Sequence, residues 1–213
     1  MNNVYIFDMD DTLVDSMIRF DEGVFSVLNE DGIAYDRLKM IATTSPLGVS
    51  GSARYFHDVL GVRGTVDEIV RRIEDSMYRL YCERIFPKAG VAEYLNRKHR
   101  EGNRLFVLTA TPHTLTDPCL KTNDLFDLFE RVLTTDDFGI QKNDVRLFDE
   151  VAKELAVSPS DILYFDDSMT AINNAKTAGY RTYGVYSEHS EEEIRYIKEH
   201  HDGFVRSFEN LTV

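Results

Sequence analysis

The sequence predicts an α/β fold in which a Rossmann-like, doubly wound parallel sheet forms the core and an all-helical domain is inserted into it. Three observations support this prediction. A short apolar strand opens the chain at residues 4–7, about seventy residues of helical periodicity follow, and strands alternate with helices from about residue 86. Such alternation is typical of a parallel sheet covered on both faces. We therefore expect a core of residues 1–14 and 84–213 and a helical domain of residues 15–83.

The composition is that of an ordinary globular protein, with 43% hydrophobic residues and a net charge of −13 at pH 7. This charge argues against a nucleic-acid partner, because proteins that bind the phosphate backbone usually carry a basic surface. No apolar run approaches the length of a membrane span, and no secretory signal is visible, so we expect a cytoplasmic protein without a membrane partner. Cys82 and Cys119 are too few for a disulfide framework and too far apart for a zinc motif. The sequence leaves the oligomeric state open.

The helical block begins soon after the first strand. Met17, Val24, Phe25 and Leu28 recur at helical spacing, and Gly32 is a typical stop. This part of the chain therefore predicts one helix.

The remainder of the helical block predicts a loop and two further helices. Residues 44–56, "TSPLGVSGSARYF", predict a loop that leads into a short helix. Residues 64–81 predict the clearest helix of the chain, because Thr65 and Glu68 form a capping box ahead of an apolar stripe. The stripe consists of Val66, Ile69, Val70, Ile73, Met77 and Leu80.

The second half of the chain predicts five more strands and the helices between them. Pro112 is expected in the first turn of the helix after the second strand, where its missing N–H costs nothing. Strands are predicted at residues 104–111, 131–137, 161–168, 181–186 and 203–208, and the other helices at residues 89–102, 143–155, 169–179 and 190–200.

Reactive side chains stand where the predicted strands end. Because the carboxyl ends of parallel strands meet at one edge of a sheet, these side chains are expected to lie together. Clustered carboxylates repel one another, and such a cluster persists when a cation neutralises it or one member stays protonated. The sequence therefore predicts a metal and phosphate site. Its members are Asp8 and Asp10 after the first strand, Thr109 at the end of the second, Lys142 after the third, and Asp166 and Asp167 after the fourth.

These residues resemble the motifs of the haloacid dehalogenase (HAD) superfamily, particularly phosphatases similar to phosphoglycolate phosphatase and relatives of β-phosphoglucomutase, in which a helical cap follows the first strand. "DMDDT" at residues 8–12 matches the Asp-x-Asp-x-Thr motif, and "VLTA" at residues 107–110 matches the strand ending in Thr or Ser. Lys142 matches the third motif, and "FDDS" at residues 165–168 matches the acidic fourth. The family often has Gly in place of Asp11 and Pro after the lysine.

The resemblance implies a phosphatase that uses Mg²⁺ to hydrolyse the phosphate monoester of a small metabolite through an aspartyl phosphate. Asp8 would attack phosphorus, which splits the hydrolysis into two displacements. Asp10 would protonate the leaving group and then activate water. The phosphate would be held by Thr109, Ala110 and Lys142, and the metal by Asp8, Asp10, Asp166 and Asp167. Supporting roles are expected for Asp11, Thr12 and Ser168 near the site and for Arg54 in the cap.

Two alternatives remain open. Phosphosugar mutases of the β-phosphoglucomutase type share the adjacent acidic pair but carry a histidine five residues beyond the position of Asp15, where this chain has Phe20. A receiver-like phosphoacceptor or an inactive binding module is the alternative of a different class, although receiver domains are shorter and lack the second aspartate. Five histidines are interpreted as surface residues because none has the spacing of zinc ligands: His57, His99, His113 and the pair His200 and His201.

Overall fold

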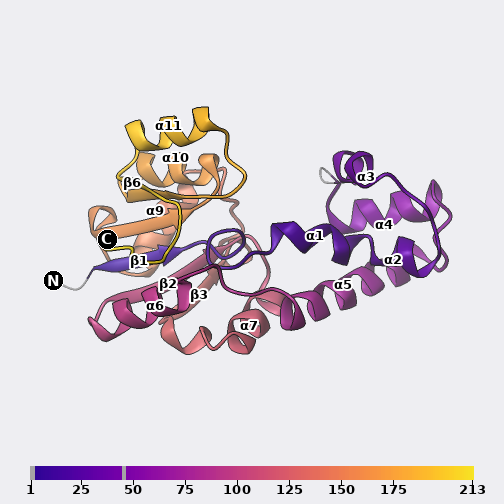
Figure 1. The fold of residues 1–213 in the computed structure, drawn as a ribbon, viewed down its shortest axis with the longest axis horizontal. Coiled ribbons are helices and arrows are strands. Elements are labelled where there is room, and N and C mark those ends of the chain that lie inside the picture. Colours follow the sequence, from indigo (N-terminus) through magenta and orange to yellow (C-terminus); the bar gives the residue numbers. More distant parts are fainter. Residues whose placement is uncertain (1–2, 45–46) are drawn as a thin grey trace. The chain divides into compact units, whose positions relative to one another are not determined.

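The computed structural model describes residues 3–44 and 47–213, and the chain divides into two compact units (Figure 1). The core unit comprises Met1–Asp15 and Phe86–Val213, and the helical unit comprises Ser16–Ile85. In the part of the chain that is described, no helix combines the length and the apolar character needed to cross a membrane.

The core unit is built on a six-stranded sheet in which every pairing is parallel, with the order β3-β2-β1-β4-β5-β6. The strand that comes first in the sequence therefore lies at the centre, between β2 and β4. The predicted α/β fold with a parallel sheet is confirmed. The strands are β1 (Val4–Phe7), β2 (Arg104–Thr109), β3 (Arg131–Thr134), β4 (Ile162–Asp166), β5 (Arg181–Val185) and β6 (Gly203–Val205).

Both faces of the central strand are buried, which explains its unbroken apolar sequence. Val4 and Ile6 belong to an aliphatic core that includes residues of α9 and α10. Tyr5 and Phe7 point to the opposite face, where they stack with the ring of Phe165. Side chains thus alternate between two layers, with α9, α10 and α11 on one side of the sheet and α6 and α7 on the other (Figure 1). The helices are α6 (Val91–Arg100), α7 (His113–Thr122), α8 (Thr135–Phe138), α9 (Arg146–Glu154), α10 (Met169–Thr177) and α11 (Glu191–His200).

The helical unit contains α1 (Met17–Val24), α2 (Ser26–Glu30), α3 (Arg37–Thr44), α4 (Gly48–Asp58) and α5 (Val66–Glu83). The all-helical insertion is therefore confirmed, and so is the capping box of Thr65 and Glu68. The single helix predicted near its start is wrong, because the chain breaks at Phe25 into α1 and α2.

The loop predicted at residues 44–56 is also wrong over most of its length. Its glycines and serines are poor helix formers, but Ala53 and Phe56 are fully buried on one face of α4, and this burial outweighs the local preference. Ser45 and Pro46 in that segment lie outside the described residues.

Three local predictions in the core unit need correction. The strand predicted at residues 131–137 ends at Thr134, because Thr134 and Asp137 form a capping box that starts α8. Pro112 is the N-cap of α7 rather than a residue of its first turn. His201 is buried, not exposed, because the chain turns there from α11 towards β6, and its Nδ1 lies 2.7 Å from the Thr182 hydroxyl.

Candidate active site

Three aspartates meet at the carboxyl ends of β1 and β4. The Asp8 N–H donates to the carbonyl of Phe165 at 2.8 Å, which continues the pairing of the two strands past β1. Asp8, Asp166 and Asp167 each offer a carboxylate oxygen, and these oxygens all lie within 4.8 Å of one another. The structure thus brings together three of the four aspartates predicted to hold a metal.

Lys142 enters this group from the segment between α8 and α9. Its Nζ lies 2.5 Å from Asp8 Oδ1 and 2.8 Å from Asp166 Oδ2. Burial alone would lower the pKa of Lys142, but the charges of Asp166 and Asp8 outweigh it, and the pKa is raised above its ordinary value. Asn174 on α10 donates its side-chain N–H to the Lys142 carbonyl at 3.0 Å, which fixes the backbone that carries the ammonium.

Asp166 is the most enclosed of the carboxylates, with its side chain 1% exposed. Besides Lys142, it accepts hydrogen bonds from the Ser168 N–H, at 2.7 Å, and from the Tyr164 hydroxyl. Ser168 itself is the N-cap of α10 and accepts from the Ala171 N–H. The role of Tyr164 was not predicted, because a tyrosine inside an apolar strand indicates nothing more than a core residue.

Asp10 is not among the three clustered carboxylates, although its charge helps to raise the pKa of Asp8. Its Oδ2 accepts from the Thr111 hydroxyl at 2.6 Å, and the Thr111 N–H donates to the Thr109 hydroxyl oxygen at 3.1 Å. The loops after β1 and β2 are thereby joined, with Ala110 exposed between the two threonines. Among the described residues, the clustered carboxylates are those of Asp8, Asp166 and Asp167, and the metal role predicted for Asp10 stays a prediction.

The supporting residues predicted from the sequence divide between the two units. The Thr12 hydroxyl oxygen accepts from the Asp167 N–H at 3.0 Å, so it orients the loop after β4. Asp11 has a left-handed backbone, with φ of 52°, and its carboxylate accepts from the Ser187 hydroxyl. Arg54 is exposed on α4 in the helical unit.

The electrostatics of the group favour a bound cation. Burial raises the pKa of the Asp8 carboxyl well above its usual range, and Lys142 only partly opposes it. Burial, followed by the charge of Asp166, raises the pKa of Asp167 to about 7. Crowded carboxylates of this kind are relieved by a divalent ion, and a donor set made only of oxygen atoms fits Mg²⁺.

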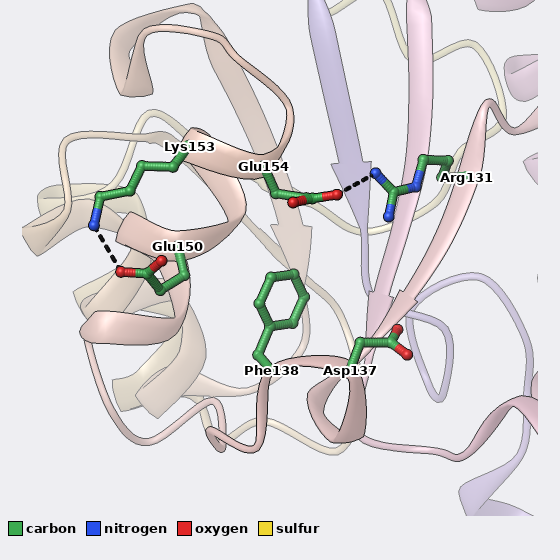
Figure 2. Close-up of a pocket in the computed structure, with 6 residues that line it drawn as sticks. All are labelled: Arg131, Asp137, Phe138, Glu150, Lys153 and Glu154. Atoms are coloured by element: carbon green, nitrogen blue, oxygen red, sulfur yellow. Dashed lines mark hydrogen bonds and ion pairs between the residues drawn. The ribbon is translucent and has the colours of Figure 1, made fainter.

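A separate cavity of about 380 Å³ lies beside β3, α8 and α9. Figure 2 shows that its two basic residues are each paired with a glutamate, Arg131 with Glu154 and Lys153 with Glu150. An anionic ligand would have to displace those carboxylates, so the cavity is a poor place for a phosphate ester. The other lining residues are Asp137 and Phe138.

Comparison with known proteins decides the family. The model of the haloacid dehalogenase-like hydrolases matches residues 5–185. This chain belongs to that family. The predictions of a HAD-superfamily member and of a hydrolase are therefore confirmed.

Relatives with curated names are phosphatases. A protein of Bacillus subtilis strain 168, YhcW, provisionally named a phosphatase, is 28% identical over 185 residues, which cover 85% of this chain and 82% of the relative. The phosphorylated carbohydrates phosphatase of Thermotoga maritima is 25% identical over 186 residues, covering 84% and 83%.

Solved structures of similar proteins share the fold. The structure of a Thermotoga maritima protein, provisionally named a β-phosphoglucomutase, has a TM-score of 0.84 at 22% identity and covers 98% of this chain and 96% of that one. YfnB of Bacillus subtilis, solved with bound magnesium and described as revealing interdomain movement, has a TM-score of 0.75 at 16% identity, covering 98% and 96%.

Proposed function

We propose that this HAD-family enzyme is a Mg²⁺-dependent phosphatase that hydrolyses a small-molecule phosphate monoester through an aspartyl phosphate on Asp8. One observation carries the proposal: the Lys142 ammonium contacts both Asp8 and Asp166 at the sheet edge where Asp167 also lies. Phosphorylated carbohydrates are the first substrates to test, since a relative over most of the chain is named for them.

Asp8 has the setting of a nucleophile. Its carboxylate lies at the carboxyl end of the central strand and is held by Lys142, which keeps one oxygen oriented while the other attacks phosphorus. The attack forms an Oδ–P bond and breaks the P–O bond to the alcohol. Water then cleaves the aspartyl phosphate and restores the carboxylate.

Asp10 would handle the proton of both displacements. It would give a proton to the departing alcohol and later take one from the attacking water. The hydroxyl of Thr111 donates to its Oδ2 at 2.6 Å, which orients the carboxyl group.

The cation and Lys142 share the task of neutralising charge. Asp8, Asp166 and Asp167 would hold Mg²⁺, which when bound stabilises negative charge on phosphoryl oxygens. Lys142 contributes a fixed positive charge next to the nucleophile, and the Thr109 hydroxyl and the Ala110 N–H would bind the remaining phosphoryl oxygens.

The helical unit would act as the cap that sets substrate choice. It encloses a cavity of about 220 Å³ that is lined by residues of α1, α3 and α4, including Phe20 and the ion pair of Asp21 with Arg37. Arg54 would contact an anionic group of the substrate. The boundaries predicted from the sequence, residues 15–83, would mark this cap domain.

The test compares Asp8→Asn and Asp10→Asn on an alkyl and an aryl phosphate by rapid quench. With Asp8→Asn, neither ester should react. With Asp10→Asn, release of the alkyl alcohol should slow by about 10²–10⁴-fold, whereas an aryl group leaves without a proton donor and should be released in a burst. Phosphoenzyme should then accumulate, because water attack also lacks its base.

Several outcomes would contradict the proposal. If Asp10→Asn slows the burst equally for both esters, Asp10 is not the general acid. If Asp8→Asn still gives a normal burst, Asp8 is not the nucleophile. Full turnover in excess chelator would exclude the metal. Formation of an isomeric sugar phosphate instead of inorganic phosphate would show a mutase.

A further inference from the structure

The loop after β5 lies against the acidic site, although sequence motifs give it no role. Because β5 pairs with β4 in parallel, with Gly184 opposite Asp166, the residues that follow both strands emerge side by side. Ser187 and His189 in this loop lie just beyond residues 5–185, which the family model matches.

Both nitrogens of the His189 ring are engaged. The Ser187 N–H points to Nδ1 at 3.1 Å, and Nε2 lies 2.7 Å from the Asp167 carbonyl oxygen. Since Nδ1 must accept, the hydrogen bonds assign the ring proton to Nε2, which donates to Asp167. The ring also packs edge-on against Phe204 of β6, with centroids 6.5 Å apart.

The main chain of Asp167 is consequently held from two sides. Its N–H donates to the Thr12 hydroxyl oxygen and its carbonyl accepts from His189. These bonds fix the peptide groups on either side of the Asp167 α-carbon, and so the direction of its carboxylate. Without them, repulsion from Asp8 and Asp166 would favour movement of this loop away from the group.

The same loop also holds Asp11. The Ser187 hydroxyl donates to the Asp11 carboxylate, and Lys88 Nζ donates to the carbonyls of both Asp11 and Tyr186. The loop itself is anchored to β6 through the Tyr186 N–H, which donates to the Val205 carbonyl at 2.7 Å. The edge strand thus supports the acidic loops after β1 and β4.

We propose that His189 is a positioning residue for Asp167, and that through it the loop after β5 determines how tightly the three-carboxylate group binds Mg²⁺. The inference rests on the proposed function, because it assumes that this group holds the cation. Groups that orient a metal ligand typically change metal affinity or activity by about 10–100-fold when they are removed.

The test measures Mg²⁺ binding by calorimetry without substrate, together with kcat, KM and thermal unfolding, for His189→Ala and His189→Gln. His189→Ala should raise the Kd for Mg²⁺ by about 10-fold or more, and should lower kcat at limiting Mg²⁺ with little change in the KM for ester at saturating Mg²⁺. The glutamine amide can still donate at the position of Nε2, so His189→Gln should bind Mg²⁺ within about threefold of the parent.

The matched control is His99→Ala, because His99 is an exposed histidine that also contacts a backbone carbonyl, that of Leu128, away from the site. It should leave Mg²⁺ binding unchanged. If His189→Ala lowers the unfolding temperature but binds Mg²⁺ like the parent, the loop is only a structural tether and the inference is overturned. If the parent itself binds no Mg²⁺ and turns over without it, the proposed function fails first, and this inference falls with it.

Discussion

Lys142 stands between two carboxylates that are almost fully enclosed, with 8% of the Asp8 side chain and 1% of the Asp166 side chain exposed. Removing one member of a buried charge group leaves the others uncompensated, which costs about 3–5 kcal/mol. We therefore expect Lys142→Met to lower the free energy of unfolding of the metal-free protein by about that amount. Urea unfolding in the presence of chelator measures it.

The double variant that combines Lys142→Met with Asp166→Asn supplies the control. Adding Asp166→Asn removes one of the stranded charges, so the double variant should be more stable than Lys142→Met alone. Equal unfolding midpoints for the parent and Lys142→Met in chelator would contradict the role of the lysine as counter-charge.

His201 gives the molecule an acid-sensitive position outside the site. Burial, followed by the charge of Lys176, lowers the pKa of His201 below its ordinary 6.5. The unfolded chain therefore takes up a proton at a higher pH than the folded one. Stability from this residue is fully present above pH 6.5 and is lost as the pH falls through the lowered pKa, by at most about 1.4 kcal/mol per pH unit.

His201→Asn should abolish the pH-dependent part of the stability that arises from this histidine. Chemical unfolding of parent and variant at pH 8, 7, 6 and 5 should show the stability difference shifting in favour of the variant below pH 6.5. A difference that stays constant across the series would mean that His201 does not titrate as its burial requires.

The motifs predicted the residues that meet at the site, and they missed those that hold the site in place. Asp8, Lys142 and Asp166 were predictable because reactive side chains at the ends of parallel strands must converge. Tyr164 and His189 were not, because a tyrosine in an apolar strand and a histidine in a loop have no local signature. Their roles depend on which strands are neighbours, and strand order is a tertiary property.

At the level of the elements, the start of α6 depends on a glycine. Gly90, the N-cap of α6, has φ of 81°, and an added Cβ would collide with the backbone of Phe208 and Glu209. Gly90→Ala should therefore carry both the left-handed penalty of about 1–2 kcal/mol and an overpacking cost of about 1–3 kcal/mol. Gly139→Ala is the control, since Gly139 has φ of 62° but open space around its Cβ position.

Thermal and urea unfolding of the two variants separate the backbone penalty from the overpacking cost. Gly90→Ala should be the less stable by about the overpacking cost. Similar losses for both would show that the C-terminal segment moves away without a penalty.

The elements that were predicted correctly have strong local signals. The capping box at Thr65 and the unbroken apolar run of β1 both define their structure within a few residues. The prediction was wrong where local preference and burial disagree, as in α4, or where two structures compete for the same residues, as at Thr134. There the outcome depends on packing against distant segments.

At the level of the whole molecule, two connecting segments near residues 15 and 86 join the units, and these segments are paired with each other. Val14 pairs with Pro87, and the Asp15 N–H donates to the Phe86 carbonyl at 3.0 Å. Such paired linkers suit a hinge. We expect residues 16–85 to move as a rigid body when a phosphate analogue binds with Mg²⁺, with each unit unchanged internally.

Crystal structures with Mg²⁺ alone and with Mg²⁺ plus the analogue would measure this change, and solution scattering would check it outside a lattice. An identical arrangement of the two units in all states would argue against gating by the helical unit.

The central place of β1 has a consequence for synthesis. Its partners β2 and β4 begin at residues 104 and 162, so the ribosome makes the whole helical unit before either neighbour exists. At translation speeds of about 5–20 residues per second, the four apolar residues wait on the order of ten seconds without a partner. Unpaired apolar strands aggregate, and charged residues next to them act as gatekeepers. The aspartates that follow the strand, Asp8, Asp10 and Asp11, are therefore positioned to act as gatekeepers for the nascent chain, a task separate from the catalysis proposed for Asp8 and Asp10.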